Sequence, residues 1–266
     1  MQSGTEGARK LYLEERQQEI LSLLDKNSFV RINNLSSHFG VSGATIRKDL
    51  RVLEQAGKLR RTHGGAIKPN PNFVETEPRP GITNALEEKV RIAHAAANLV
   101  QDKDVLYIHS GSTCLEFARA LEGKRQLTVI TNDLSVALTA DEVLEDETVV
   151  LLGGTLRPGF RYTYGSEALK QVKSYYIPTT YMSCSGFSLT DGFAMHKIED
   201  ANWVRALLDV SERHIMLCDS TKVGVHALAH AAPVDDVDCL VIGREVCEGA
   251  RDFLESDAPD LDIIYA

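Results

Sequence analysis

The sequence predicts an α/β protein of two domains: a small N-terminal winged helix-turn-helix and a larger, doubly wound, mostly parallel α/β domain. Residues 14–68 combine short helix-period runs with a basic, glycine-containing hairpin. Four of the eight prolines then fall within residues 69–80, which is typical of a stiff linker. From residue 84 onward, strand-like and helix-period runs alternate, as βαβ units do. We therefore expect domains at 14–68 and 84–266, joined by a linker at 69–83.

The small domain begins with helices expected at 14–26 and 33–39. Leu35 and Phe39 lie on one face of the second helix. Gly40 can adopt a positive φ in the turn that follows, and Ser42 can cap the next helix. This arrangement is typical of a helix-turn-helix.

The helix expected at 43–55 has an apolar face and a cationic face. Ile46, Leu50 and Leu53 recur at helical spacing and predict a buried stripe. The opposite face carries Thr45, Arg47, Lys48 and Arg51. A short helix of this kind fits the DNA major groove, so we interpret it as a recognition helix.

Gly57 ends this helix. A basic strand and a Gly-Gly turn follow it. Together they predict a wing that lies on the sugar–phosphate backbone. The candidate DNA-binding residues are Ser42, Thr45, Arg47, Lys48, Arg51, Lys58, Arg60, Arg61 and His63. The alternative is a solvated amphipathic helix followed by an ordinary hairpin. Any one basic residue fits that alternative well, whereas the whole constellation in this order favours DNA binding.

The charge distribution supports the same interpretation. The chain carries a net charge of −9, but residues 9–68 hold 12 Lys/Arg against 6 Asp/Glu. The remainder holds 17 basic and 32 acidic residues. A basic head on an acidic body concentrates the attraction for phosphates at one end of the molecule.

The large domain is expected to alternate strands and helices. The predicted strands are 105–108, 127–131, 148–152, 180–184, 215–218, 239–242 and 262–265. The predicted helices are 87–100, 114–121, 135–140, 166–172, 198–210 and 248–254. Short connections between alternating elements predict a mostly parallel sheet with helices on both faces.

Polar or glycine-rich loops follow five of these strands. In a parallel sheet, ligands bind beyond the carboxyl ends of the strands, where such loops enter helices. Each loop alone is ordinary, but their convergence predicts a site for a small, anionic, hydroxyl-rich molecule. The candidate ligand-binding residues are His109, Ser110, Gly111, Ser112, Thr113, Asn132, Gly154, Arg157, Gly186 and Lys222.

Several other functions are disfavoured. The sequence has no 18-residue apolar run and no signal-peptide core, and its five cysteines lack CxxC spacing. We expect a cytoplasmic protein without membrane association, with Cys184, Cys218 and Cys239 as reduced core residues. His226 and His230 have the i, i+4 spacing of metal ligands on a helix, but no third ligand is near in sequence. We interpret them as surface or packing residues and expect no metal and no cofactor.

Three segments resemble the bacterial DeoR-type transcriptional regulators. They are ERQQEIL at 15–21, VSGATIRKDLRVLEQAGKLRRTHGG at 41–65 and EEKVRIA at 87–93, and the similarity extends over roughly 14–245. The resemblance implies an effector domain similar in fold to ribose-5-phosphate isomerase, which binds phosphorylated sugars or related metabolites. Family motifs match Ser110–Thr113, Thr131-Asn132, Gly153-Gly154 with Arg157, Gly165, Gly186, Gly192, Glu199 and Asp219–Lys222 with Gly224. His109 stands where the family usually has an acidic residue.

The function we expect is sequence-specific transcriptional regulation, as a repressor of a carbohydrate-metabolism operon modulated by a phosphorylated metabolite. The expected partners are a double-stranded DNA operator, that metabolite and further copies of the chain in a dimer or tetramer. The alternative is a sugar-phosphate enzyme of the isomerase type with an accessory nucleic-acid-binding domain. Asp219 and Glu199 are candidate bases for that enzyme, but the loops contain no paired carboxylates.

Overall fold

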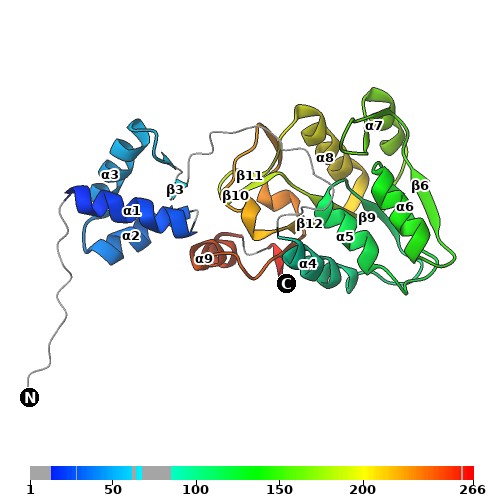
Figure 1. Cartoon of the computed structure of the whole chain (residues 1–266), viewed down its shortest axis with the longest axis horizontal. Helices are drawn as coiled ribbons and strands as arrows, with labels where there is room; N and C mark the ends of the chain where they lie inside the picture. Colours follow the sequence, from blue (N-terminus) through cyan, green and yellow to red (C-terminus); the bar gives the residue numbers. More distant parts are fainter. Residues whose placement is uncertain (1–12, 28, 62–63, 68–84, 259) are drawn as a thin grey trace, which may run out of the picture. The chain divides into compact units, whose positions relative to one another are not determined.

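The computed structural model describes residues 13–27, 29–61, 64–67, 85–258 and 260–266. The chain divides into two compact units, which are taken separately below (Figure 1). The linker predicted at 69–83 and the candidate residue His63 lie outside the described residues.

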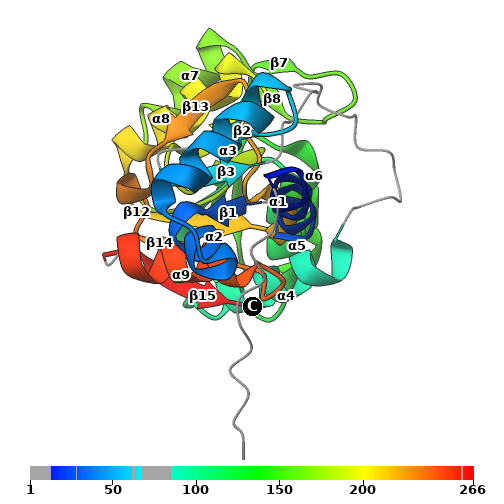
Figure 2. The ribbon, with the colours of Figure 1, turned by 90° about the vertical axis from the view of Figure 1, so that its left-hand side faces the viewer.

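The described part of the small domain contains three helices and a small antiparallel sheet (Figure 2). Its elements are α1 (Leu13–Asn27), β1 (Phe29–Arg31), α2 (Ile32–Phe39), α3 (Gly43–Gln55), β2 (Arg60–Arg61) and β3 (Gly65–Ile67). The strands lie in the order β1-β3-β2. The helices agree with the prediction to within a residue at each end, whereas β1 was not predicted. This strand is too short to carry a periodicity, and it forms only because β3 of the wing pairs with it.

One hydrophobic cluster holds this domain together. The three helices contribute Ile20, Leu35, Ile46 and Leu50, among others, and Leu59 adds a side chain from the start of the wing. The apolar stripe predicted on 43–55 is confirmed, because Ile46 and Leu50 are fully buried. Burial of this stripe fixes which face of α3 remains exposed.

A seven-stranded, entirely parallel sheet forms the large domain. Its strands are β4 (Val105–Ile108), β5 (Thr128–Thr131), β6 (Thr148–Leu151), β9 (Ile177–Ser183), β12 (Ser211–Cys218), β14 (Cys239–Ile242) and β15 (Asp262–Tyr265). They lie in the order β15-β14-β12-β9-β4-β5-β6, and every neighbouring pair is parallel. All seven predicted strands are present, so the predicted doubly wound α/β fold is confirmed.

Helices cover both faces of this sheet (Figure 1). The helices are α4 (Leu86–Ala97), α5 (Ser112–Ala120), α6 (Leu134–Val143), α7 (Ser166–Val172), α8 (Ile198–Val210) and α9 (Glu248–Asp257). In the main hydrophobic core, α4, α5 and α6 pack against one face of the sheet, where they meet side chains such as Leu106 and Ile108 of β4. Tyr107 alternates with these two and points to the other face, where its hydroxyl meets Trp203 of α8.

Smaller elements complete the large domain. They are the hairpin β7 (Thr155–Leu156) and β8 (Thr163–Tyr164), the strands β10 (Gly186–Ser188), β11 (Gly192–Met195) and β13 (Ala229–Ala232), and the short helices η1 (Ser220–Lys222) and η2 (Val234–Asp236). His226 precedes β13 and His230 lies within it, so the two histidines do not share a helix face. All five cysteines are free, and Cys184, Cys218 and Cys239 are buried as predicted. Among the described residues, no helix is long and apolar enough to span a membrane.

Candidate DNA-binding helix and strand-end ligand site

The turn before α3 sets how this helix is presented. Gly40 adopts a left-handed conformation at φ 62°, which is the conformation expected for a glycine at this turn. Ser42 caps α3, because its side-chain oxygen accepts a hydrogen bond from the backbone N–H of Thr45 at 3.2 Å. The hydroxyls of Ser42 and Thr45 also lie 3.0 Å apart. The helix therefore begins at Gly43 with a satisfied N-terminus.

The outer face of α3 is cationic. Arg47, Lys48 and Arg51 are exposed, and Thr45 is half-buried next to its cap. These are the side chains predicted to face DNA, and the structure places them together on one face of one helix. A rigid helix with this face exposed has the dimensions and charge that suit a major groove.

A buried ion pair that the sequence analysis missed ties α3 to α1. Arg16 Nε lies 2.6 Å from Asp49 Oδ2, and these side chains are only 10% and 1% exposed. The sequence does contain a signal for it: Asp49 falls between Ile46 and Leu53 on the apolar stripe of α3. A carboxylate in that position requires a buried partner.

The basic segment after α3 forms an exposed strand. Lys58, Arg60 and Arg61 are all exposed. Arg61 is also held by the end of α3, since its Nε lies 2.6 Å from Glu54 Oε2 and its backbone N–H donates to Glu54 Oε1 at 2.8 Å. These hydrogen bonds from Arg61 lower the pKa of Glu54. Arg61 therefore fixes β2 against α3 in addition to adding positive charge.

The parallel sheet of the large domain brings the five predicted loops to one edge. They follow β12, β9, β4, β5 and β6, which are consecutive neighbours in the sheet. The ligand-binding candidates, predicted one loop at a time, therefore share the carboxyl edge of the sheet. We refer to them together as the strand-end site.

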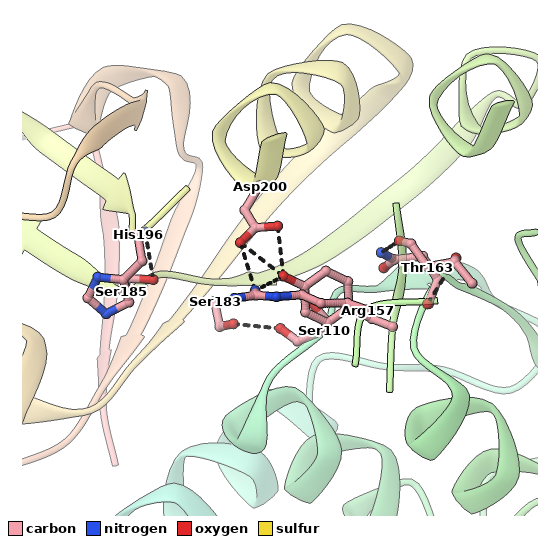
Figure 3. Close-up of polar contacts among 9 residues, drawn as sticks. Ser110, Arg157, Thr163, Ser183, Ser185, His196 and Asp200 are labelled. Carbon is pink, nitrogen blue, oxygen red and sulfur yellow. Dashed lines mark hydrogen bonds and ion pairs between the residues drawn. The ribbon is translucent and has the colours of Figure 1, made fainter. Parts of the chain in front are cut away.

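The loop after β4 leads into the N-terminus of α5, which begins at Ser112. Gly111 has φ 127°, and a Cβ there would lie 2.8 Å from Ser183 Oγ. The Ser183 hydroxyl donates to the carbonyl oxygen of Ser110 at 2.9 Å (Figure 3). This contact with β9 sets the path of the loop. The first backbone N–H groups of α5 form the kind of helix N-terminus that attracts a phosphate.

Asn132 takes part in a buried hydrogen-bond network. Its Oδ1 accepts from the Tyr107 hydroxyl at 2.6 Å, which in turn accepts from the indole N–H of Trp203 at 2.7 Å. Its Nδ2 donates to the carbonyl oxygen of Thr163 at 2.8 Å. Both ends of the amide therefore have partners within the protein, and the role that this geometry supports for Asn132 is to position β5 and the β7–β8 hairpin.

His109 lies at the end of β4 and is 2% exposed. Burial lowers its pKa to about 4, so the ring is neutral at neutral pH. Its Nδ1 is buried and has no hydrogen-bond partner within the described part of the chain. An unsatisfied polar atom of this kind beside the loop 110–113 is available to a ligand.

Arg157 is buried in a cluster of its own. Its guanidinium carbon lies 3.8 Å from the centre of the Phe160 ring, and its Nη1 lies 3.4 Å from Asp200 Oδ2 (Figure 3). The Tyr162 hydroxyl contacts both Arg157 and Asp200, and burial raises the pKa of this hydroxyl. Asp200 therefore balances the charge of Arg157, so an anionic ligand would compete with a carboxylate for it.

Two of the candidate glycines are required by close approach within the protein. A Cβ on Gly186 would lie 2.4 Å from the carbonyl oxygen of Val225. Gly154 has φ 148°, and a Cβ on it would lie 2.7 Å from the carbonyl oxygen of Tyr164. These glycines let loops pack tightly around the strand-end site.

The loop after β12 contains Lys222, which is half-buried at the end of η1. The same loop contacts the start of α4, where Glu88 accepts hydrogen bonds from the backbone N–H (2.6 Å) and hydroxyl (3.1 Å) of Ser220. Lys89 Nζ lies 3.6 Å from Asp219 Oδ2. Burial raises the pKa of Glu88 and lowers that of Lys89. The first helix of the large domain, α4, carries the segment EEKVRIA and therefore contacts the strand-end site. This contact was not predicted from the sequence.

Comparison with known families identifies both halves of the chain. The DeoR-like helix-turn-helix domain matches residues 16–72, and the DeoR C terminal sensor domain matches residues 84–244. The chain belongs to the DeoR family of transcriptional regulators. The large domain is therefore a sensor domain, and the small domain binds DNA.

Individual relatives agree with this assignment. The chain is 33% identical over 232 residues to the uncharacterized HTH-type transcriptional regulator YulB of Bacillus subtilis, covering 85% of this chain and 87% of the relative. It is 30% identical to the putative aga operon transcriptional repressor of Escherichia coli O157:H7, covering 87% of each. These relatives are regulators and not enzymes, so the isomerase alternative is not supported. Among solved structures, ribose 5 phosphate isomerase A from Neisseria gonorrhoeae matches with a TM-score of 0.38 and 17% identity, over 53% of this chain and 55% of that one.

Proposed function

We propose that this DeoR-family regulator is a sequence-specific repressor of a carbohydrate-metabolism operon, and that a phosphorylated sugar or related metabolite changes its affinity for the operator. The observation that carries the DNA half is the cationic face of α3, exposed opposite a fully buried stripe. The repressor role is supported by the relative named as an aga operon repressor. We further propose that the protein binds paired half-sites as a dimer or tetramer, because a single winged helix covers little DNA.

We assign different roles to the helix and the wing. Thr45, Arg47, Lys48 and Arg51 enter the major groove, where one arginine contacts a guanine edge and contributes roughly 1–3 kcal/mol of base discrimination. Ser42 places the N-terminus of α3 near a phosphate. Lys58, Arg60, Arg61 and His63 contact the sugar–phosphate backbone, which adds affinity but little sequence preference.

The ligand half of the proposal rests on the strand-end site. The loop Ser110–Thr113 holds the phosphate at the N-terminus of α5, and Lys222 contacts the same anionic group. The neutral His109 ring faces the rest of the ligand. Asn132, Gly154, Arg157 and Gly186 shape the site through the contacts described above.

Fluorescence anisotropy with DNA tests the first half. Arg47→Ala should lose roughly 1–3 kcal/mol of preference for operator over random DNA. Arg61→Ala should weaken binding to both DNAs equally and lower the salt slope by about one. Arg125→Ala is the matched control, because this side chain is 66% exposed in the sensor domain and its loss removes the same charge. Equal effects of Arg47→Ala and Arg61→Ala on every DNA sequence would contradict the assigned roles.

Titration with a panel of sugar phosphates tests the second half. One metabolite should change the affinity of the wild-type protein for its operator. Lys222→Ala should abolish that response and leave the DNA affinity in the absence of ligand unchanged. Lys170→Ala is the control, because this lysine is 73% exposed on α7. If Lys222→Ala loses DNA binding as well, Lys222 has a folding role instead.

A further inference from the structure

The first turn of α4 is where the chain enters the sensor domain. The helix begins at Leu86, and residues 68–84 before it lie outside the described part of the chain. Its N-cap position is occupied by Ala85, whose side chain has no polar atom that could cap a helix. The helix packs against β12 and β14 of the parallel sheet. Contacts with the segments that follow these two strands take the place of a cap.

Glu88 makes the main polar contact of this turn. It is buried at 5% exposure, whereas its neighbour Glu87 is exposed. The Glu88 carboxylate accepts hydrogen bonds from the backbone N–H of Ser220 at 2.6 Å and from its hydroxyl at 3.1 Å. A buried carboxylate requires such donors, and here they come from a residue 132 positions away. Glu88 therefore ties the first turn of α4 to η1, the short helix that follows β12.

The end of β14 provides the space in which this carboxylate lies. Gly243 directly follows the strand, and a Cβ at this position would overlap the carboxylate of Glu88. Any other residue there would displace the side chain from Ser220. The carboxylate thus lies between Gly243 on one side and the two donors of Ser220 on the other. Its position is fixed by both neighbours and follows any movement of η1.

The helix η1 also carries the side chain proposed to meet the ligand. Lys222 ends it, and Asp219 caps its start by accepting from the backbone N–H of Thr221 at 3.1 Å. Lys89 Nζ lies 3.6 Å from Asp219 Oδ2. Burial, and also the positive charge of Lys222, lowers the pKa of Lys89. An anion at Lys222 would therefore change the charge balance of the segment to which Glu88 is bonded.

We propose that Glu88 couples the two elements: when an anionic ligand binds at Lys222 and shifts η1, the bonds from Ser220 to Glu88 carry the first turn of α4 with it. This inference rests on the proposed function, which places the anionic group of the ligand at Lys222. A ligand shifts an equilibrium only by binding one arrangement better than another. Through Glu88, the position at which the chain enters the sensor domain becomes part of that difference.

Four variants separate this coupling from folding and from charge. Glu88→Ala removes both acceptors, and Glu87→Ala is the matched control because it removes the same charge from the exposed face of the same turn. Ser220→Pro removes both donors from the other side. A proline fits the first position of η1, because Asp219 before it is extended at φ −79° and ψ 153°. Glu88→Gln keeps an acceptor for the Ser220 N–H and should behave like the wild-type protein.

Hydrogen–deuterium exchange of the full chain tests the proposal, with inorganic phosphate as the probe and sodium chloride at equal ionic strength as the reference. In the wild-type protein, phosphate should slow exchange in both segments, 219–224 and 86–93. At a phosphate concentration ten times its Kd, amides that exchange only from the ligand-free state slow by about tenfold. In Glu88→Ala and Ser220→Pro, only 219–224 should slow, whereas both segments should slow in Glu87→Ala and Glu88→Gln.

The outcomes distinguish this inference from the proposed function. Slowing of 219–224 without slowing of 86–93 in the wild-type protein would overturn the coupling and leave the ligand site intact. Slowing of 86–93 that persists in both Glu88→Ala and Ser220→Pro would also overturn it. If neither segment of the wild-type protein slows, the ligand site at Lys222 is refuted, and the coupling with it. Trp203 emission confirms that each variant is folded, and Ser220→Pro decides the test if Glu88→Ala is not.

Discussion

The stability of the DNA-binding domain should depend on the buried ion pair between Arg16 and Asp49, so that replacing a single carboxylate oxygen of Asp49 destabilises the domain. Asp49→Asn replaces a carboxylate oxygen by an amide and leaves the guanidinium buried 2.6 Å from its former partner. Removal of one partner from a buried pair costs about 3–5 kcal/mol. A domain of the size of residues 14–68 is stable by about 3–8 kcal/mol, from roughly 0.05–0.15 kcal/mol per residue. The variant should therefore lose most of the stability of this domain.

Urea unfolding followed by circular dichroism at 222 nm measures this loss. The chain has one tryptophan, Trp203, which lies in α8 of the sensor domain. Its fluorescence therefore reports the other domain and should be unchanged by Asp49→Asn. A loss below about 1 kcal/mol, which is the size of an ordinary surface substitution or little more, would refute the reasoning. A shift of the Trp203 transition would refute it too.

A double variant separates the charge from the packing. Arg16→Met with Asp49→Leu fills a similar volume with apolar atoms and leaves no buried charge. Replacements of this kind are often neutral or stabilising. The double variant should therefore unfold at a urea concentration near that of the wild-type protein and well above that of Asp49→Asn. A double-mutant cycle gives the coupling free energy between the two side chains. A double variant as unstable as the single one would show that packing and not charge decides the stability.

Two further predictions concern the sensor domain. Because burial lowers the pKa of His109 to about 4, the unfolded chain binds more protons than the folded one between about pH 4 and 6.5, and stability falls as the pH falls through this window. This shift contributes on the order of 3 kcal/mol to the free energy of unfolding. The urea midpoint, followed by Trp203 fluorescence, should therefore fall less between pH 7 and pH 4.5 in His109→Asn than in the wild-type protein. An equal fall in both proteins would contradict the lowered pKa of His109. Gly186→Ala should destabilise the domain by about 1–3 kcal/mol because its Cβ meets the carbonyl of Val225, whereas Gly249→Ala, with open space around it, should not. Thermal unfolding of both variants checks this, and equal melting temperatures would count against the close approach.

Local signals in the sequence predicted most of the fold. The turn residues Gly40 and Ser42 and the period of Ile46, Leu50 and Leu53 act within a few residues of one another, and α3 runs over the predicted range. The same holds for α7, α8, β4, β14 and β15. Burial on both faces of a parallel strand leaves a continuous apolar run, which is why inner strands such as β4, β5 and β14 were recognised. Two- and three-residue strands such as β1 and β7 carry no comparable signal.

The contacts that position the site depend on residues far apart in sequence. Asp49 and Arg16 are separated by 33 positions, and Tyr107 and Trp203 by 96. A sequence shows that a buried polar group needs a partner, but the topology decides which partner it meets. The hydrogen-bond partners of Asn132 were therefore not predicted, although its place at the end of β5 was predicted correctly.

Arg157 shows why residue type alone overestimates a ligand site. Its guanidinium follows β6 at the carboxyl edge, where an arginine predicts recognition of an oxyanion. The structure gives it Asp200 and the ring of Phe160 instead, and a buried arginine needs such partners whether or not a ligand is present. A phosphate that bound there would first have to displace a carboxylate. The N-terminus of α5 also has a carboxylate beside it, because the backbone N–H of Gly111 hydrogen-bonds to Asp133, whereas Lys222 is half-buried in the loop after β12. We therefore expect Lys222, rather than Arg157, to meet the anionic end of an effector, while Arg157 holds the β7–β8 hairpin against α8.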